Sequence, residues 1–382
     1  MDLNVTYLRD DMTEWFRTLH RHPEPAFEEN FTSGYIASLL KTFGYEVHEG
    51  IGGTGIVALL RNSSGKKSIG LRADFDALQM QEDNDLPYKS ETPGRAHLCG
   101  HDGHATMLLG AAKFLSDHRT FDGTLVLIFQ PAEETQLGAS AMMRDGLFEK
   151  FPVDAVFAMH NMPGLKAGSF SFHDGSTMSA VDNWDITLTG KAVHASMPEA
   201  GTDPVVAGAA LLMGLQTIVS RNLSPWDNSV VTVGAFHAGT VPNSVPESAT
   251  LRLSIRNMRN EDREMTLRRI EELTEYTAKA YGCSAEILKN VSGKALFNDP
   301  ETTAFAASVA EKYFGSERVT YPGSKYMASE DFAFMLAEKK GTYLFIGNGD
   351  TPQPHNTAYV FNPEILPIGA TYWVALVHEF LK

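Results

Sequence analysis

The chain has 382 residues, of which 43% are hydrophobic, and its formal net charge is -15. This length and composition predict two or three globular domains with a substantial buried core, and they exclude a disordered chain. The acidic excess is spread along the sequence and argues against nucleic acid or an anionic membrane surface as a partner.

The first part of the chain alternates predicted helices with predicted strands. The helices have apolar residues at helical spacing, and the strands are short, nearly continuous apolar runs. Alternation of this kind is typical of a mainly parallel sheet that is buried on both faces. The predicted helices cover residues 8–20, 31–43 and 104–117, and the predicted strands cover 54–60, 68–74, 123–130 and 154–160.

The pattern changes near residue 180, where the predicted order becomes β-α-β-β-α-β. This order is the split βαβ unit, which forms a compact α+β layer of ferredoxin-like type. Helix and strand then alternate again up to a last helix at 364–381. We therefore predict an α/β domain formed by residues 1–179 and 294–382, interrupted by a smaller α+β domain at 180–293. The predicted strands of the smaller domain are 183–190, 229–237, 249–258 and 284–291, and its helices are 203–220 and 261–281.

Three features of the sequence bear on the compartment. The only cysteines, Cys99 and Cys283, argue against a disulfide framework and fit a reducing environment. The N-terminal sequence MDLNVTYLRDDMTEWF has neither a basic start nor an apolar segment, so we expect no signal peptide. No apolar run approaches the roughly 18 residues of a transmembrane helix. The expected location is the cytoplasm.

Several residues that can bind metal follow predicted strands. Glu133 and Glu134 come after the strand at 123–130, His160 ends the next strand, and His355 lies in a loop after the strand TYLFIG. Sites in open α/β sheets form at the carboxyl ends of the strands, so we expect these side chains to gather at one edge.

Cys99 and His101 precede the helix at 104–117, with Gly100 between them. In an extended segment this spacing points both side chains the same way, and the glycine permits a close approach. Thiolate, imidazole and carboxylate ligands together suit zinc or another first-row ion. Five ligands are too many for one tetrahedral ion, which indicates two metals.

Each of these features alone also has an ordinary structural explanation. A lone buried cysteine is usually core packing, and adjacent glutamates are usually a solvated turn. A histidine at the end of an apolar strand is more often a core or edge residue, and His355 beside Asn356 could form a turn. Their joint position at strand ends favours a site.

The adjacent glutamates suggest a division of labour. Neighbouring side chains leave the backbone in different directions, so one carboxylate can bind metal while the other faces the substrate. A water molecule activated by metal still needs a base to carry its proton to the leaving group. We interpret Glu134 as the ligand and Glu133 as the base.

The sequence resembles the M20 metallopeptidases over residues from about 10 to the end. The motifs are HLCGHDGHATMLLGAA, FQPAEE, MHN, GKAVHASMPEAGTDPV, VPNSVPESATLRLSIRN, SEDFAFM and PHN. The most similar branch is the amidohydrolase one, with hippurate hydrolases, N-acyl-amino-acid aminoacylases and auxin-conjugate hydrolases. The resemblance implies a di-metal catalytic domain and an inserted lid domain.

The resemblance also implies roles for individual residues. The metal ligands would be Cys99, His101, Glu134, His160 and His355, with Cys99 bridging the ions and Glu133 as general base. Other branches have a metal-binding histidine where this chain has Arg72, which cannot bind metal. Asp74 would either orient a histidine or be an ordinary strand-end residue.

In the lid, His194 matches a histidine that approaches the scissile carbonyl, often from a partner subunit. Asn243 and Arg256 match groups that hold the substrate, plausibly by its carboxylate. Without the resemblance, Arg256 would be a surface strand residue, Asn243 a turn residue, and His194 equally a loop or a site residue.

Four further expectations concern residues outside the proposed ligand and substrate sets. We expect Asp102 to cap the helix that follows it and His104 to support a metal ligand. The SEDF sequence at 329–332 is either a family signature or a helix cap. Cys283 is expected to be ordinary core packing.

The resulting hypothesis is hydrolysis of the amide bond of N-acyl amino acids, with two divalent ions among zinc, manganese, cobalt and nickel. The alternatives are a dipeptidase or aminopeptidase on the same scaffold and a metal-binding protein without catalysis. A dipeptidase needs an acidic group for the substrate's free amine, and the sequence places none in the lid. A homodimer or higher oligomer through the lid is also expected. The acyl-group preference stays open.

Overall fold

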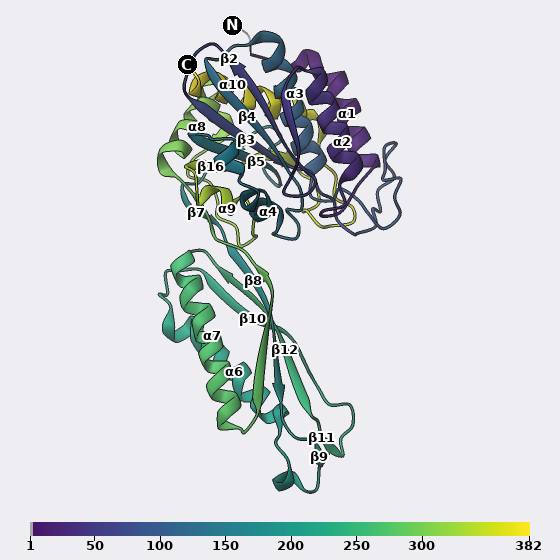
Figure 1. The fold of residues 1–382 in the computed structure, drawn as a ribbon, viewed down its shortest axis with the longest axis vertical. Coiled ribbons are helices and arrows are strands. Elements are labelled where there is room, and N and C mark those ends of the chain that lie inside the picture. Colours follow the sequence, from purple (N-terminus) through teal and green to yellow (C-terminus); the bar gives the residue numbers. More distant parts are fainter. Residues whose placement is uncertain (1–2) are drawn as a thin grey trace. The chain divides into compact units, whose positions relative to one another are not determined.

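The computed structural model describes residues 3–382, which divide into two compact units (Figure 1). The second unit comprises Ser176–Leu296 and also the short segment Tyr326–Glu330. The first unit comprises the preceding residues together with Phe297–Lys325 and Asp331–Lys382. The chain therefore returns once more to the second unit after the inserted domain that the sequence predicts.

The first unit is built on an eight-stranded sheet in the order β1-β2-β4-β3-β5-β16-β6-β15. The central strands β4, β3, β5 and β16 are parallel, whereas β1 and β2 form an antiparallel hairpin at one edge. The predicted α/β class with a mainly parallel sheet is confirmed. The strands are β1 (Glu46–Ile51), β2 (Gly55–Asn62), β3 (Ser68–Asp74), β4 (Gly123–Gln130), β5 (Ala155–Pro163), β6 (Phe170–Ser171), β15 (Val319–Thr320) and β16 (Gly341–Gly349).

Helices cover this sheet, and the most buried of them is α3. Its small residues Gly103 and Gly110 allow close packing: a Cβ at Gly103 would collide with the ring of Phe361, and one at Gly110 would collide with Met12. Helix α3 packs against α1, α10 and β3. The helices are α1 (Arg9–Arg21), α2 (Asn30–Thr42), α3 (His101–His118), α4 (Gly138–Arg144), α5 (Leu147–Lys150), α8 (Pro300–Phe314), α9 (Ala333–Leu336) and α10 (Leu366–Phe380), with 3-10 turns η1 (Thr6–Leu8), η3 (Ser316–Arg318) and η4 (Pro363–Ile365).

The second unit has a four-stranded antiparallel sheet in the order β10-β12-β8-β13. Helices α6 and α7 pack on each other and on this sheet, and the core between them includes Trp184, Leu211 and Ile270. The β-α-β-β-α-β sequence pattern therefore folds as a split βαβ layer. Its elements are β8 (Ala180–Thr189), α6 (Pro204–Asn222), β10 (Ser229–Ala238), β12 (Ser248–Asn257), α7 (Asn260–Ala280) and β13 (Ser284–Ser292), with the short β9 (Val193–His194), β11 (Ser244–Val245) and η2 (Pro198–Ala200). The short strands β7 (Gly175–Met178) and β14 (Leu296–Asn298) stand where the chain passes from one unit to the other.

The expectation that no apolar segment approaches membrane-spanning length is wrong for helix α6. Its 19 residues are long and apolar enough to cross a membrane by length and composition only. Ala207, Leu211, Leu215 and Ile218 lie in the core of the second unit, so burial in that core accounts for part of its apolar character. An Asp followed by Pro predicts the start of a helix, and Asp203 does cap α6. Its Oδ1 accepts the N–H of Val205 at 2.8 Å.

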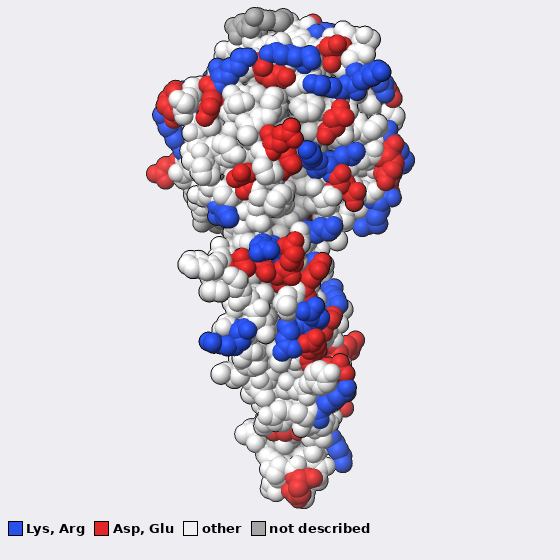
Figure 2. Space-filling view, turned by 90° about the vertical axis from the view of Figure 1, so that its left-hand side faces the viewer, with Lys and Arg blue, Asp and Glu red and all other residues white. Residues whose placement is uncertain are grey.

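The surface drawn in Figure 2 carries Lys and Arg side chains interspersed with Asp and Glu side chains. Both signs of charge occur on the face of the first unit shown there, so the net charge of -15 is not gathered into one field on that face.

Candidate metal centre

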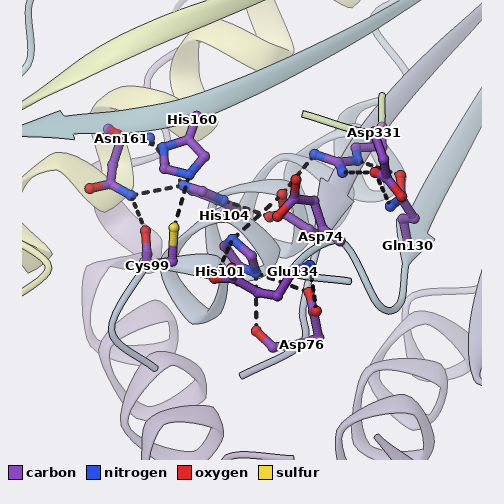
Figure 3. A network of polar contacts seen from close by, with 12 residues as sticks. Asp74, Asp76, Cys99, His101, His104, Gln130, Glu134, His160, Asn161 and Asp331 are labelled. Carbon is purple, nitrogen blue, oxygen red and sulfur yellow. Dashed lines mark hydrogen bonds and ion pairs between the residues drawn. The ribbon is translucent and has the colours of Figure 1, made fainter. Parts of the chain in front are cut away.

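The five predicted ligands come together in the first unit, and Figure 3 labels Cys99, His101, Glu134 and His160 among them. Sγ of Cys99 lies 3.4 Å from Nε2 of His160, and Nε2 of His355 lies 3.2 Å from Oε2 of Glu134. Two groups of potential ligands share Cys99. Within each group, the ligand atoms lie within 4.8 Å of one another: Cys99–His101–His160 and Cys99–Glu134–His355. Cys99 is common to both groups, which is the arrangement that a bridging thiolate requires.

Two buried atoms of this cluster support a bound cation. Nε2 of His101 and Oε1 of Glu134 have no hydrogen-bond partner among the described residues, and they lie 3.9 Å apart. A buried acceptor without a partner is costly, and divalent ions bound at these atoms would satisfy both. Sulfur, imidazole nitrogen and carboxylate oxygen together suit a borderline first-row ion. The residues therefore fit the metals that the sequence implies.

The protonation of the cluster follows from its burial. Burial, followed by the nearby Glu134 carboxylate, raises the pKa of the Cys99 thiol to about 12. Burial lowers the pKa of His160 well below its ordinary value, so its ring is neutral. Nδ1 of His160 donates to the backbone oxygen of Asn161 at 2.6 Å, which leaves the Nε2 lone pair facing Cys99. Metal binding must therefore displace the thiol proton of Cys99.

Gly100 shapes the turn that presents Cys99 and His101. Its φ of 95° is in the left-handed region, and a Cβ there would collide with Nδ2 of Asn161 and the hydroxyl of Tyr359. The predicted close approach at the glycine is therefore present. The extended geometry expected for this segment is wrong, because His101 is already the first residue of α3.

Asp76 connects two of the ligands, and sequence reasoning missed it. Nδ1 of His101 lies 3.1 Å from Oδ1 of Asp76, and the backbone N–H of Glu134 donates to its Oδ2 at 3.0 Å. A carboxylate that binds the far nitrogen of a ligand histidine fixes its tautomer and ring orientation. The sequence signal was only a second acidic residue in RADFD, two positions after Asp74.

Arg72 lies in a buried ionic network beside the ligands, with Asp74 and Asp331, which Figure 3 labels. Its Nη1 donates to Oδ2 of Asp74 at 2.7 Å, and its Nη2 lies 3.3 Å from Oδ1 of Asp331. Oδ1 of Asp74 accepts from Nδ1 of His104 at 2.6 Å, because Nε2 of His104 accepts the N–H of Asn161 at 3.0 Å. Asp74 therefore orients a histidine, and His104 in turn holds the strand segment next to His160.

The capping expectation for Asp102 is wrong, and the helix-cap alternative for SEDF is not what is observed at α9. The N-cap of α3 is Gly100, and Asp102 lies in the first turn, where its Oδ2 is 2.7 Å from Nδ1 of the buried His20. The carboxylate of Asp331 in SEDF does not cap the following helix α9. Its Oδ2 instead accepts the N–H of Ala139 at 2.8 Å, at the start of α4. Long-range contacts of this kind carry no local sequence signal.

Glu133 follows β4 in a turn and is largely buried. Nε2 of Gln136 donates to its Oε1 at 3.0 Å, and the ligand atoms of Glu133, Glu134 and His101 lie within 4.8 Å of one another. The two adjacent carboxylates therefore both face the cluster, within reach of a reacting group there.

The predicted substrate residues lie in the second unit, in two separate places. His194 is on β9 and pairs with Ser244 of β11, and the backbone oxygen of Asn243 accepts the N–H of Ala195. Both side chains are exposed. Arg256 is at the far end of β12, eight residues beyond Ser248 or roughly 27 Å along a strand, where its Nη1 donates to Oγ of Ser329 at 3.1 Å. Within the unit, Arg256 is therefore not brought together with His194 and Asn243.

The remaining cysteine, Cys283, lies in the apolar core of the second unit. Burial raises the pKa of its thiol. Its surroundings there include Ile270 and Ala278, in agreement with ordinary packing.

Comparison with known proteins places the chain in a family. Residues 70–379 match the model of Peptidase family M20/M25/M40. The hippurate hydrolase of Campylobacter jejuni is 43% identical over 364 residues, which are 95% of each chain. The N-acetyl-L-cysteine deacetylase of Bacillus subtilis is 33% identical over 97% of this chain and 88% of its own. A crystal structure of a Bacillus subtilis protein described as a dinuclear metal-binding peptidase of the M20 family superposes with a TM-score of 0.85, at 28% identity and 98% and 99% coverage. With these matches and the metal-ligand cluster together, the chain belongs to peptidase family M20 and is a metal-dependent amidohydrolase.

Proposed function

We propose that this protein hydrolyses the amide bond of N-acyl amino acids, of the hippurate or N-acetyl amino acid type, to a carboxylate and a free amino acid. The observation that carries the proposal is the pair of ligand groups sharing Cys99, with the second carboxylate, Glu133, on the same turn as the ligand Glu134. The names of the relatives, a hippurate hydrolase and a deacetylase of N-acetyl-L-cysteine, support the substrate class.

The five ligands would hold two divalent ions among zinc, manganese, cobalt and nickel. When bound, such ions polarise the acyl carbonyl and lower the pKa of the attacking water. Cys99 would contribute to both ions, His101 and His160 to one, and Glu134 and His355 to the other, as the two groups suggest. Asp76 would keep Nε2 of His101 directed to the site by holding Nδ1.

Glu133 would act as the general base and then as the general acid. Its carboxylate takes a proton from the attacking water and gives it to the nitrogen of the departing amine. Gln136 holds one carboxylate oxygen, which limits the orientations that Glu133 can adopt. The carbon–nitrogen bond breaks as that nitrogen is protonated, and the acyl group leaves as a carboxylate.

The second unit would act as a lid that binds substrate. Arg256 would hold the carboxylate of the amino acid product, and burial lowers the pKa of its guanidinium without removing its charge. His194 would stabilise the oxyanion, and Asn243 would assist in substrate binding. Because His194 and Asn243 lie at β9 and β11, before the start of β12, whereas Arg256 is near the end of β12, they would serve the site of a second copy in a homodimer or larger oligomer. We expect the enzyme in the cytoplasm.

The test is Glu133→Gln, assayed with metal counted per chain. Turnover of hippurate or an N-acetyl amino acid should fall about 100- to 10,000-fold while metal content stays unchanged. Glu134→Gln is the matched control, and it should lose metal as well as turnover. Near-normal turnover in Glu133→Gln would overturn the role of the base. Faster cleavage of a dipeptide panel than of N-acyl amino acids would overturn the substrate class.

A further inference from the structure

The segment Pro131–Gly138, which we call the acidic turn, carries both Glu133 and Glu134 and has an unusual backbone. Ala132 has a φ of 53° and Gln136 a φ of 61°, although neither is glycine. Left-handed backbone at residues with a Cβ is uncommon and persists only where surrounding contacts hold it. The direction of the Glu133 side chain depends on this backbone.

The backbone groups of Ala132 hold the acidic turn in place. Its backbone oxygen accepts the N–H of Gly138 at 3.1 Å and the hydroxyl of Thr135 at 3.1 Å, which close the turn on itself. Its backbone N–H points the other way and donates to Oε1 of Glu29 at 2.9 Å. The left-handed residue is therefore fixed on one side by the turn and on the other by Glu29.

The Glu29 side chain accepts the N–H of Ala132 and does not cap α2, the helix that it precedes. The free N–H groups of that helix at Phe31 and Thr32 donate to the carboxylate of Glu24. The Glu29 side chain is fully buried, and its Oε2 accepts the hydroxyl of Thr54 at 2.5 Å. Burial raises the pKa of Glu29 to about 7. A buried carboxyl in this position is costly unless its hydrogen bonds are made.

Three buried carboxylates hold the backbone of this region, and Glu29 is the most separable of them. Asp76 accepts the N–H of Glu134 but also contacts His101, and Asp331 accepts the N–H of Ala139 but also contacts Arg72. The hydrogen bonds of the Glu29 side chain go to Thr54 and to the backbone of Ala132. A substitution at Glu29 therefore acts on the acidic turn without removing a contact to a proposed metal ligand.

We propose that Glu29 is a positioning residue for the reaction, which holds the N–H of Ala132 and so fixes the turn from which Glu133 reaches the substrate. This inference rests on the proposed role of Glu133 as general base. Glu29 itself touches neither substrate nor metal. Its effect is transmitted through one backbone hydrogen bond to the residue before Glu133.

The experiment compares Glu29→Met, which fills the same space without an acceptor, with Glu29→Gln, whose side-chain oxygen can still accept the N–H of Ala132 while its amide donates to Thr54. In the metal-loaded enzyme with hippurate, Glu29→Met should lower kcat about 100-fold with KM changed less than about threefold, as expected for a misplaced catalytic group. Glu29→Gln should keep kcat within about fivefold of the wild type. Metal per chain should be unchanged in both. Glu28→Gln, at the exposed neighbour that pairs with Arg95, is the control and should be indistinguishable from wild type.

A double-mutant cycle separates positioning from general damage. If Glu29 acts through Glu133, adding Glu29→Met to Glu133→Gln should not lower the residual turnover further. Additive losses, loss of metal in Glu29→Met, or wild-type kcat in Glu29→Met would each overturn the inference. If Glu29→Met does not fold, Glu29→Asp, which withdraws the acceptor from Ala132, gives the same comparison. An active Glu133→Gln would instead overturn the proposed function, so the two failures are distinguishable.

Discussion

The predicted functional residues of the two units have different surroundings. In the first unit the metal-binding cluster is surrounded by buried charged residues such as Arg72, Asp74 and Asp76, each of which is at most 2% exposed. In the second unit His194 and Asn243 are exposed. A buried charge must be paired by groups of the same fold, whereas an exposed one is solvated until a ligand or another chain arrives.

This difference indicates that the first unit is organised before substrate binds and that the second unit completes its contacts afterwards. Substitutions in the first unit should therefore change metal content or folding as well as turnover. Substitutions at the substrate residues of the second unit should change kinetic constants alone. The predictions below test this contrast, from the largest effect to the smallest.

Replacing the shared ligand should have the largest effect. Cys99→Ala removes the atom common to both ligand groups, so metal content should fall below that of the wild type. Turnover should fall by more than about 100-fold, which exceeds the loss typical when a residue that only hydrogen-bonds to a ligand is replaced. Cys283→Ala, at the buried cysteine of the second unit, should keep metal and turnover. Metal analysis and the hippurate assay check both variants. Full metal content in Cys99→Ala would contradict the shared-ligand arrangement.

Replacing the buried arginine should destabilise the first unit. Arg72→Met leaves the carboxylates of Asp74 and Asp331 buried beside an apolar group, and the free energy of unfolding should fall by about 3–5 kcal/mol. Arg263→Met removes the partner of Asp182 in the second unit at a more exposed position, and about 1–3 kcal/mol is expected there. Denaturant unfolding measures both. Equal losses in the two variants would contradict the contrast between the units.

The stability of the first unit should depend on pH through His20. Although burial opposes its charge most strongly, hydrogen bonds with Asp102 and Glu82 raise the pKa of His20 from 6.5 to about 9. The folded state therefore binds this proton more tightly than the unfolded state. The resulting stabilisation, on the order of 3 kcal/mol, should be complete below pH 6.5 and lost as the pH rises through about 9.

The measurement is the free energy of unfolding of the metal-loaded protein between about pH 6 and pH 10. His20→Gln should flatten this part of the profile. His22→Gln, two residues away at a more exposed position, should leave the profile unchanged. Identical profiles for wild type and His20→Gln would show that the contacts of His20 with Asp102 and Glu82 do not provide this pH-dependent stabilisation.

The smallest effect on the protein itself is expected at Arg256. Arg256→Met should raise KM for hippurate about 10- to 100-fold, as for loss of a hydrogen bond to a charged group, while metal content and unfolding stay as in the wild type. Arg252→Met, on the same strand but more exposed and beside Asp185, is the control and should leave KM unchanged. Loss of stability in Arg256→Met would assign this residue to the structure of the second unit.

Much of the fold follows from local patterns, and the exceptions have physical reasons. The buried strand β4 was predicted at 123–130, as observed, because its apolar run is continuous. Strand β1 at Glu46–Ile51 was missed, since an exposed edge strand shows no apolar alternation. Helix α3 begins at His101 and not at His104, because a left-handed Gly100 starts it in place of a polar cap.

The candidate site was predictable where the type of side chain indicates its chemistry. Cys99, His101 and His355 stand in motifs and have side chains that bind metal. The buried polar pairs around the cluster have no such local signal, because their members are distant in the sequence: His20 and Asp102 are 82 positions apart, and Arg72 and Asp331 are 259 apart. Such pairs follow from the packing of whole elements and not from any local pattern.

The segment Tyr326–Glu330 has a consequence for how this architecture can be recombined. Because the second unit is made of two separate stretches, Ser176–Leu296 and these five residues, it is not a single continuous cassette. Grafting only the long stretch from a relative would leave the short one mismatched with its new surroundings, because Oγ of Ser329 in the short stretch accepts from Arg256 in the long one. Chimeric enzymes made to exchange substrate preference should therefore carry both stretches from the same parent.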